Sequence, residues 1–564
     1  MSFWENVKSN SGWKADPEWR RLVIRWSAVS LLLIGVAAWF SYGFFQWDEY
    51  YQVTEFVSHK LGKTPAADLA WEYHAQIRPW MQPAIYYVVA RAAMFLGVEN
   101  PFTLAFIFRA LTGLCGWVAI VSMMLSARVF FANRGTRRLA VIILALLWLI
   151  PYLAVRTSSE SLSGDFFTLG VAVLVLGSSC TLDQSSRHTP CAAAGYGTRN
   201  VPTALTFARR RFPIAALAMA GICFGLAFEF RYQIAFAVAG VVFWVALIGS
   251  ENRRRGILNA CMILAGVVPP ILAGTAIDYW GYGMWCLVPW NYFNLNILQH
   301  RADAFGTSPA WWYFFLMNDA DEGLLAPVTL LWTAAMLITW VRRPRHLVTW
   351  VTLPFFVAHC AVAHKEIRFL FPMTLLATFF FLLAFAPDEA DERQPRLIRW
   401  IWEWRGRWPA RVMYAANFVG LAIACFVCGR RAIEMQRFIY DNYGAGSHAY
   451  LLGKQNPYQL CGAMYFYRPK GFVLNDLRSY DELKEALRHG PRRFLLITDR
   501  ISLADEQAGI APEATLVWRS YPSWLEHFNY FHWLDRARTF SMYAIDREGR
   551  PAESVAKTAT DRRR

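Results

Sequence analysis

The segment 364–369 (HKEIRF) carries four ionisable side chains in a turn between two long apolar runs, residues 347–363 and 369–386. Ionisable groups at a membrane boundary are costly unless they are solvated or used in function, and basic side chains attract phosphate. A charged anchor at the boundary is the plain alternative. We interpret the segment as an anion site in which Glu366 orients its neighbours. Its candidate phosphate contacts are His364, Lys365 and Arg368.

A pair of adjacent carboxylates, Asp48 and Glu49, lies in segment 46–52 (QWDEYYQ), directly after the first long apolar run. Such a pair could supply a general base for an acceptor hydroxyl, or it could be two solvated acids at the membrane surface. Neighbouring side chains point in different directions on a regular backbone, so at most one of them faces a given substrate. A base and a basic cluster that stabilises a leaving phosphate are the minimum for glycosyl transfer from a lipid-phosphate sugar.

Three further arginines lie in connections that we place on the same side of the membrane as these groups. Arg231 lies between the fifth and sixth apolar runs, Arg156 follows the third, and Arg78 lies in the first long connection. Each could contact phosphate or anchor its segment at the interface, because arginine does both in membrane proteins.

The composition is that of a polytopic membrane protein, because 56% of the 564 residues are hydrophobic and only 17% are charged. The apolar residues gather in runs of about 16–22, a length that crosses a bilayer as a helix. The formal net charge of +16 could indicate a nucleic-acid partner, but the arginines cluster in short loops between the runs. The positive-inside rule accounts for that pattern, so we expect membrane lipids and no nucleic acid as partners.

The apolar runs predict eleven transmembrane helices. Their expected ranges are 22–46, 101–131, 138–155, 161–181, 212–228, 232–249, 257–277, 323–341, 347–363, 367–386 and 412–430. With a cytoplasmic N-terminal segment, 1–21, the arginine-rich loops all fall on the cytoplasmic side. The short run 83–97 contains Arg91, and counting it as a span would reverse this order. We expect it to form a helix that lies along the outer membrane face.

The same topology predicts a transmembrane catalytic module over 22–430 and an extracytoplasmic domain over 431–564. Two long external loops, 47–100 and 278–322, belong to the module. In the C-terminal domain, the pattern of segment 471–502 predicts strand–helix–strand and therefore a small α/β unit. The expected fold class is mainly α and polytopic, with interfacial helices in the first external loop.

These residues occur in motifs that resemble glycosyltransferase family 22, the polyprenyl-phosphate-sugar-dependent enzymes with the GT-C fold, and especially its GPI-mannosyltransferase branch. The resemblance runs in family order over nearly the whole chain. The matching motifs are 48–52 (DEYYQ), 69–73 (LAWEY) with Ile77-Arg78, 290–296 (WNYFNLN), 308–313 (SPAWWY), 364–369, 528–533 (FNYFHW) and Asp535-Arg536.

The resemblance implies an inverting transfer, in which an acceptor hydroxyl attacks the anomeric carbon of a polyprenyl-phosphate sugar, by default mannose. Asp48 would be the general base, and Glu49 would orient it or the acceptor. The donor phosphate would be held by His364, Lys365 and Arg368, with Arg231 as a helper. Further substrate contacts would be Tyr50, Glu72, Arg78, Arg156 and Glu160. Such sites need no metal or other cofactor in this branch, and we identify no dedicated metal cluster in the sequence.

Departures from the family pattern indicate a bacterial relative. The family's His-Pro before the acid pair is Gln46-Trp47 here, and the Asn and Glu that follow the third span are Glu160 and Ser163. Mannose, a pentose and another hexose stay open as the donor sugar, as does the identity of the lipid-linked or surface glycan acceptor. We favour the bacterial inner membrane over the endoplasmic reticulum, with the active site on the periplasmic or luminal face.

Two other functions would use similar residues: a polymerase or ligase of lipid-linked glycans, and a transporter or flippase of such lipids. Internal repeats and broken helices at mid-membrane are typical of transporters. The sequence shows no repeat, and Pro269-Pro270 alone is a weak indication of a broken helix. The charged candidates gather at one membrane face, which favours one-sided surface chemistry.

Overall fold

The computed structural model describes residues 3–180, 210–317, 326–387, 396–453, 455–499, 514–530, 533–537 and 539–546. The motif positions 531 and 532 and the end of the second predicted external loop lie outside these ranges. The chain forms two compact units. The first comprises Met1–Ser41, Glu72–Val89 and Ile107–Val427, and the second comprises Tyr42–Trp71, Ala90–Phe106 and Cys428–Arg564. Parts of the first predicted external loop therefore fold with the C-terminal region.

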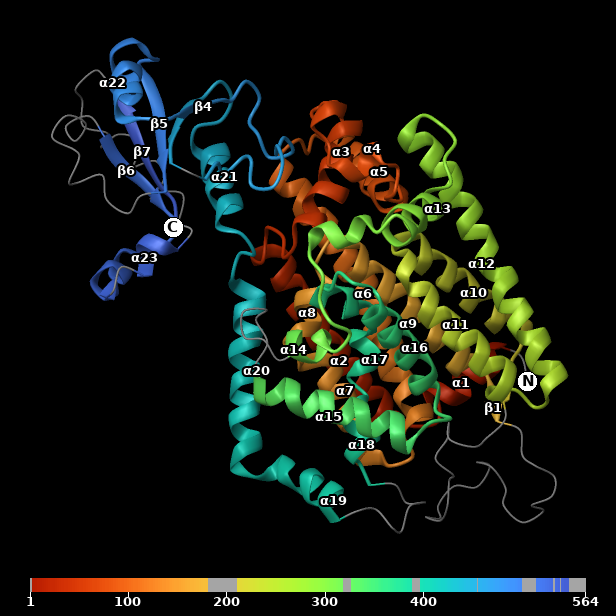
Figure 1. Cartoon of the computed structure of the whole chain (residues 1–564). Helices are drawn as coiled ribbons and strands as arrows, with labels where there is room; N and C mark the ends of the chain where they lie inside the picture. The colour runs from red at the N-terminus through yellow and green to blue at the C-terminus, as the bar shows by residue number, and fades with distance from the viewer. Residues whose placement is uncertain are drawn as a thin grey trace, which may run out of the picture. The chain divides into compact units, whose positions relative to one another are not determined.

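The first unit is built almost entirely of helices (Figure 1). Its longer helices are α1 (Phe3–Ser11), α2 (Pro17–Phe40), α7 (Arg134–Leu146), α9 (Ser159–Gly177), α10 (Ile214–Phe230), α11 (Ala235–Trp244), α12 (Arg253–Tyr282), α15 (Ala326–Arg342), α16 (Leu347–Ala361) and α20 (Trp408–Phe426). Its shorter pieces include α4 (Trp71–His74), α8 (Leu149–Ala154), η3 (Tyr232–Ile234), η4 (Val245–Gly249), α13 (Val288–Phe293), η5 (Asn294–Leu298), η6 (Arg301–Phe305), α14 (Trp312–Leu316), η7 (Ile367–Met373), α17 (Thr374–Ala377), α18 (Phe380–Phe385), α19 (Arg396–Glu403) and η8 (Trp404–Gly406). The residues Ser179–Cys180 (β1) and Arg210–Arg211 (β2) pair as a short antiparallel ribbon. Two helices, α5 (Met81–Phe95) and α6 (Pro101–Phe130), contribute to both units.

The expected membrane helices are present. Each predicted span overlaps a helix or a run of helical pieces in the described residues. Within the described ranges, six stretches are long and apolar enough to cross a membrane, and four shorter apolar helices accompany them. The predicted interfacial run forms α5, whose 15 residues extend about 22 Å, less than the hydrocarbon thickness. The mainly helical membrane architecture is therefore confirmed.

Some boundaries differ from those predicted, for local reasons. The first predicted span, 22–46, corresponds to α2, which runs from Pro17 to Phe40. It begins earlier than predicted because Asp16 caps it by accepting the Trp19 N–H at 2.9 Å. The predicted single span 138–155 is divided into α7 and α8. The predicted span 367–386 is a 3-10 turn followed by two short helices, and Pro372 in that turn cannot donate a helical hydrogen bond.

Close helix contacts hold the first unit together around α9 and α10. Helix α10 packs against both α9 and α12, and α11 packs against α16 (Figure 1). The approach of α10 to α12 needs glycine, because a Cβ added to Gly221 would lie 2.8 Å from the Cα of Gly266. Helix α9 likewise meets η7 at Gly164, where a Cβ would lie 2.7 Å from Pro372 Cα. This last contact brings the start of α9 next to the 364–369 segment.

The second unit contains a five-stranded mixed sheet in the order β4-β3-β5-β7-β6. Its strands are β3 (His448–Leu452), β4 (Val473–Leu477), β5 (Arg493–Thr498), β6 (Ala514–Arg519) and β7 (Ser541–Asp546), and its helical pieces include η1 (Glu49–Thr54), α3 (Glu55–Lys60), η2 (Ala66–Asp68), α21 (Arg431–Asn442), α22 (Tyr480–His489), η10 (Ser523–Phe528) and α23 (Trp533–Arg536). Strands β4 and β5 both pair parallel to β3, whereas β7 is antiparallel to β5 and β6.

The predicted strand–helix–strand segment is confirmed as β4, α22 and β5, drawn in blue in Figure 1. Alternating residues of the strands supply two apolar clusters. Met435 and Ile439 of α21 join the cluster that contains Leu451, and Leu483 of α22 joins the cluster that contains Leu496. Because residues on opposite faces of a strand alternate, these two helices cover the two faces of one sheet.

Candidate active site

Glu160 lies in the first turn of α9. Ser158 caps this helix, since its hydroxyl accepts the Ser161 N–H at 3.2 Å. The Ser159 hydroxyl donates to Glu160 Oε2, also at 3.2 Å. A carboxylate is favoured at a helix N-terminus by the helix dipole. The Glu160 side chain is only 1% exposed, so its charge needs partners within the protein.

Two arginines from other turns supply those partners. Arg231 ends α10 and places Nη2 3.3 Å from Glu160 Oε1, and Arg368 in η7 places Nη1 3.6 Å from the same oxygen. The two arginine side chains are 5% and 10% exposed. Both guanidinium groups also lie over the Phe369 ring, each 5.2 Å from its centroid, in cation–π geometry. Three predicted external turns therefore meet in one buried charge cluster.

Glu366 holds Arg368 from a second side. It accepts Arg368 Nε at 2.6 Å and Nη2 at 2.9 Å, a bidentate pair, and its Oε1 lies 2.9 Å from His364 Nε2. Burial would raise the pKa of the Glu366 carboxyl, but the His364 hydrogen bond and the charge and hydrogen bonds of Arg368 outweigh burial and hold the pKa well below its usual value of 4.5. The hydrogen bond to Glu366 raises the pKa of His364 above its usual 6.5. In this geometry Glu366 orients both neighbours.

The Lys365 ammonium points elsewhere. It donates to the backbone carbonyls of Val362 at 2.6 Å and Ser308 at 2.9 Å. Carbonyl groups at a helix C-terminus lack helical partners, and Val362 is the C-cap of α16. Lys365 therefore fastens the end of α16 to the segment around Ser308. In the described part of the chain, its ammonium does not enter the charge cluster.

A relay of polar contacts extends the cluster to the first loop. Arg231 Nε donates to Gln233 Oε1 at 3.0 Å, and Gln233 Nε2 donates to the Tyr292 hydroxyl at 3.0 Å. The Arg78 guanidinium lies 5.9 Å from the centroid of the Tyr292 ring, and its Nη2 is 3.7 Å from Glu72 Oε1. The structure therefore links the predicted substrate contacts Glu72 and Arg78 to the arginines through Gln233 and Tyr292.

The backbone around Arg78 is clamped by the last turns of α12. The Trp80 N–H donates to Asp278 Oδ1 at 2.8 Å, and the Tyr282 hydroxyl donates to the Arg78 carbonyl at 2.7 Å. The Arg78 N–H also donates to the Tyr282 hydroxyl at 3.3 Å, so hydrogen bonds on both sides of the Arg78 Cα fix the direction in which its side chain leaves the loop.

Arg156 lies in a different environment. It is 1% exposed and donates from Nη2 to the Ser41 carbonyl and to the Ser41 hydroxyl, the latter at 3.0 Å. Its guanidinium lies 4.9 Å from the centroid of the Tyr152 ring. These contacts fasten the residue after α2 to α8 and its following turn, so the geometry gives Arg156 a packing role.

An apolar cavity lies beside the charge cluster. Its volume is about 170 Å³, and Ile367 and Phe371 of η7 form part of its wall. Its other walls are mostly aromatic and aliphatic side chains of α15, α16 and the residues before α8. Since Ile367 directly precedes Arg368, a lipid chain in this cavity would end next to the arginines.

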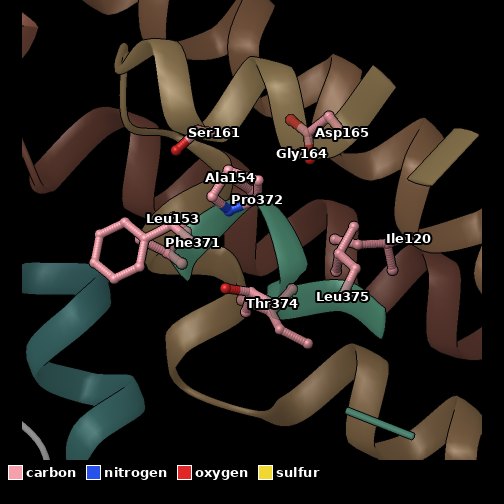
Figure 2. Close-up of a pocket in the computed structure, with 11 residues that line it drawn as sticks. Ile120, Leu153, Ala154, Ser161, Gly164, Asp165, Phe371, Pro372, Thr374 and Leu375 are labelled. Carbon is pink, nitrogen blue, oxygen red and sulfur yellow. The ribbon is translucent and has the colours of Figure 1, made fainter. Parts of the chain in front are cut away.

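A second, smaller cavity lies on the other side of Phe371 and Thr374, which line both cavities. Figure 2 shows Asp165 and Ser161 of α9 on one wall, with Pro372 and Thr374 facing them. Asp165 is 8% exposed, and its Oδ2 has no hydrogen-bond partner within the described residues.

Asp48, Glu49 and Tyr50 belong to the second unit and differ in exposure. Asp48 directly precedes η1 and is half-buried. Glu49 is 2% exposed, and its Oε1 accepts the N–H groups of Phe45 at 2.9 Å and Gln46 at 3.3 Å. Tyr50 is buried and its hydroxyl donates to Glu55. The backbone therefore engages Glu49, Glu55 engages Tyr50, and Asp48 is the one of the three that reaches the surface.

In the described ranges, no group of three or more His, Cys, Asp or Glu side chains could hold a metal ion.

The family model described as the Alg9-like mannosyltransferase family matches residues 26–469, well over half of the chain. The chain belongs to this family. The resemblance drawn from the motifs is thereby confirmed.

Two similar proteins and one solved structure show the extent of the similarity. GPI mannosyltransferase 3 of Trypanosoma brucei brucei is 30% identical over 185 residues, 29% of this chain and 32% of that protein. GPI mannosyltransferase 3 of Yarrowia lipolytica is 24% identical over 380 residues, 63% of this chain and 60% of that protein. The matched region thus spans 32% to 60% of these relatives' length. The crystal structure of ArnT from Cupriavidus metallidurans bound to undecaprenyl phosphate superposes with a TM-score of 0.46 at 14% identity, covering 94% of this chain and 99% of that chain.

Three residues near the candidate site were not predicted from the sequence, namely Gln233, Tyr292 and Glu55. Gln233 lies two residues after Arg231 in the same turn. Tyr292 lies in the motif 290–296, which supports the family resemblance but predicts no separate role for this residue. Glu55 follows Asp48 by seven residues, or about two helical turns, which is a spacing that predicts a shared helix face. That spacing was the available signal for Glu55, whereas Gln233 gave none beyond its proximity to Arg231.

Proposed function

We propose that this protein is an integral-membrane inverting glycosyltransferase. It moves a sugar, by default mannose, from a polyprenyl-phosphate donor to a hydroxyl of a lipid-linked or surface glycan acceptor. The observation that carries the proposal is the buried pair of arginines, Arg231 and Arg368, which converge on Glu160 beside an apolar cavity. Membership of a mannosyltransferase family supports mannose as the default sugar.

The arginine pair suits a departing phosphate. Guanidinium groups bind phosphate oxygens with paired N–H donors, and they act more strongly where water is excluded. Glu366 holds the Arg368 fork in one orientation through its bidentate contact. As the bond between the anomeric carbon and the phosphate oxygen breaks, its electron pair passes to the phosphate, and the two guanidinium groups stabilise the added charge. The prenyl chain occupies the cavity that begins at Ile367.

Asp48 is the general base of this proposal. An acceptor hydroxyl attacks the anomeric carbon from the side opposite the phosphate and transfers its proton to a carboxylate. Glu49 Oε1 already accepts two backbone N–H groups, so Glu49 supports the turn, and the half-buried Asp48 takes the proton. No metal ion takes part, so a chelator leaves turnover unchanged.

The test is turnover by the purified protein with a series of polyprenyl-phosphate sugars and a glycan acceptor. Consumption of one donor with formation of an inverted glycosidic product supports the proposal. Asp48→Asn is expected to lower kcat by at least about 1,000-fold, because the transition state loses its proton acceptor. Normal turnover by Asp48→Asn contradicts the assignment of the base.

Liposomes distinguish the enzyme from a transporter of lipid-linked glycans. Labelled donor lipid that crosses the bilayer without any covalent product contradicts the proposal. We further propose the bacterial inner membrane as its location, with transfer on the periplasmic face. Protease and label accessibility of residues near Asp48 in sealed vesicles tests this orientation.

A further inference from the structure

Glu55 is a buried carboxylate of the second unit that receives four hydrogen bonds. It is 1% exposed. Its donors are the Tyr50 hydroxyl, the Thr64 hydroxyl at 2.5 Å, and the backbone N–H groups of Tyr465 at 2.7 Å and Phe466 at 3.2 Å. Burial raises the pKa of the carboxyl above its usual 4.5, although these hydrogen bonds oppose the shift. A buried carboxylate with this many donors is a fixed point of the local structure.

The donors come from two segments that are 410 residues apart in the sequence. Tyr50 and Thr64 belong to the first loop, and the two backbone N–H groups belong to residues 461–466, which we call the strap. A second contact joins the same segments, because the Tyr51 hydroxyl donates to the Gly462 carbonyl at 2.6 Å. The approach is close, since a Cβ on residue 462 would lie 3.2 Å from the Tyr51 ring.

The helix η1 lies between Asp48 and Glu55 and connects the contacts of Glu55 to Asp48. All six residues of η1 are buried, and η1 begins directly after Asp48. The Tyr50 ring stacks on Tyr467 at 5.7 Å, just beyond the strap, while its hydroxyl is held by Glu55. The segment η1 is a π-helix, and π-helical turns are frequent at functional sites. Asp48, which is half-buried, therefore lies at the end of a buried block.

The other side of the turn is held by a second part of the C-terminal region. Arg430 Nη2 donates to the Phe45 carbonyl at 3.1 Å, and its guanidinium lies 4.6 Å from the centroid of the Trp47 ring. Since residues on both sides of Asp48 are fixed by the C-terminal region, the backbone at Asp48 has little freedom of its own.

We propose that Glu55 is a positioning residue, which, together with the strap, sets the direction of the Asp48 carboxylate. The inference rests on the proposed function, in which Asp48 is the base. A base must lie within hydrogen-bond reach of the proton that it removes, and a displacement of about 1 Å lowers rates by about 100-fold. The C-terminal region then acts on the reaction through the strap and Glu55.

The test uses Glu55→Gln in the full-length protein. Glutamine keeps the volume and can still accept the strap N–H groups, but it loses the charge that holds the Tyr50 and Thr64 hydroxyls. We expect kcat to fall by about 10- to 100-fold while the donor KM changes less than about two-fold. A residue that only stabilised the fold would lower the unfolding midpoint and leave kcat of the folded fraction unchanged, and that result overturns the inference.

Asp68→Asn is the matched control. Asp68 is exposed and accepts the Tyr465 hydroxyl at 2.5 Å, so it joins the same two segments at the surface without touching Glu55. We expect its kcat to stay within about two-fold of the unmodified protein. A loss as large as that of Glu55→Gln shows that the strap acts as general packing and overturns the role of Glu55.

Two more variants keep the result interpretable. If Glu55→Gln does not fold, Tyr50→Phe removes the Glu55 contact nearest to Asp48, and it must show the same fall in kcat with an unchanged donor KM. If both fold, the double variant must be no slower than Glu55→Gln, because the two act through one path. Activity in Asp48→Asn rejects the proposed function itself. An inactive Asp48→Asn with a fully active Glu55→Gln rejects only this inference.

Discussion

Neighbouring basic residues in one short segment have different partners. Arg368 lies between two carboxylates, Glu160 and Glu366, whereas Lys365 is surrounded by backbone carbonyls. A phosphate can replace a carboxylate around a guanidinium group, because both are anions with oxygen acceptors. It cannot replace backbone carbonyls without opening the end of α16. The sequence alone gives these two residues the same role, and their environments separate them.

Arg368→Ala is expected to lower kcat/KM for the donor by roughly 100-fold, or about 2.7 kcal/mol, with a smaller effect on acceptor KM. The reason is the loss of one of two guanidinium groups that hold the departing phosphate. Steady-state rates over a donor concentration series measure it. Arg368→Lys is the matched control and should retain an intermediate rate, because it keeps the charge and loses the bidentate geometry. An unchanged donor response in Arg368→Ala contradicts the phosphate role.

Lys365→Ala is expected to give the opposite pattern. The carbonyls of Val362 and Ser308 lose a charge-assisted donor, so the free energy of unfolding should fall by about 1–3 kcal/mol. The donor KM should change by less than about two-fold. Thermal unfolding in detergent and donor kinetics, measured on one preparation, check both parts. A large rise in donor KM without destabilisation would support the sequence prediction that Lys365 contacts the donor phosphate.

The contact between His364 and Glu366 predicts a pH dependence of stability. The pKa of His364 is raised, so its stabilising charge is fully present below about pH 6.5 and is lost as the pH rises through the raised value. The pKa of Glu366 is lowered, so its contribution is present above about pH 4.5 and is lost as the pH falls through the lowered value. Both contributions coexist between these limits.

His364→Gln should therefore lower the unfolding midpoint most near pH 5.5 and least near pH 8. Midpoints of both proteins across this range, in one buffer series, give the difference. A difference that is constant with pH would show that His364 contributes through packing and not through its charge.

The side chains of the candidate site could be predicted from the sequence better than their partners could. Ionisable residues beside long apolar runs attract attention by their type alone, and the structure brings Glu160, Arg231 and Arg368 together. Which oxygen each guanidinium group reaches depends on helix packing over more than 200 residues, and local patterns carry no information about it. Tyr50 illustrates the same limit, because its hydroxyl is engaged by Glu55 inside the protein.

At the scale of secondary-structure elements, α9 combines two functions along one helix. Its first turn presents Glu160 to the arginines, and five residues later Asp165 faces a small cavity under η7 (Figure 2). Gly164 allows η7 to lie against this part of the helix. The position of Arg368 in η7 therefore depends on the packing of α9 as well as on its own ion pairs.

Asp165→Leu is expected to raise the free energy of unfolding by about 1–3 kcal/mol. A buried carboxyl without a partner is unfavourable, and leucine fills apolar space beside Ile120 and Leu375. Thermal unfolding in detergent measures the change. Ser163→Ala, on the same helix, should destabilise the protein instead, because the Ser163 hydroxyl donates to the Ala227 carbonyl at 2.8 Å. Destabilisation by Asp165→Leu would show that Asp165 has a polar partner in the functional protein.

The positions of the helices can be predicted from hydropathy, whereas the breaks within them cannot. Apolar runs of sufficient length define where a helix can cross a membrane, and the described helices lie where those runs are. Hydropathy is insensitive to backbone hydrogen bonding, so the run that contains Pro372 looks continuous although the backbone there forms a 3-10 turn. The five-residue connection between α2 and the Gln46–Asp48 segment was missed for a similar reason, since Gly43 and the aromatic residues beside it are apolar.

At the scale of the whole molecule, the two units are interleaved along the chain. The C-terminal region folds with Tyr42–Trp71 and Ala90–Phe106. The chain therefore leaves the first unit twice, and it returns for the second time at Ile107. The residues around Asp48 therefore depend on a part of the chain that is synthesised after all segments of the first unit. Hydropathy cannot reveal this dependence, because it indicates where apolar runs lie and not which distant segments pack together.

Truncation after Val427 is expected to expose the first-loop segment. Glu55 would lose both strap N–H groups, and Tyr51 would lose the Gly462 carbonyl. Limited proteolysis, followed by mass spectrometry, should show new cleavage within residues 42–71 of the truncated protein at protease levels that leave the full-length chain intact. Equal protection in both proteins would show that the first loop folds without the C-terminal region.

The carboxylate of Glu160 lies where the donor phosphate is proposed to bind. Without substrate, the enzyme therefore discriminates between soluble anions and lipid-borne phosphates. A soluble anion must compete with an internal carboxylate that is already in position at 3.3 Å from Arg231, and it gains little by the exchange. A lipid-borne phosphate gains in addition from the burial of its hydrocarbon chain, at about 25 cal/mol per Å² of apolar surface. Free phosphate and water-soluble sugar phosphates are therefore poor inhibitors, and the internal anion acts as a filter for membrane-anchored donors.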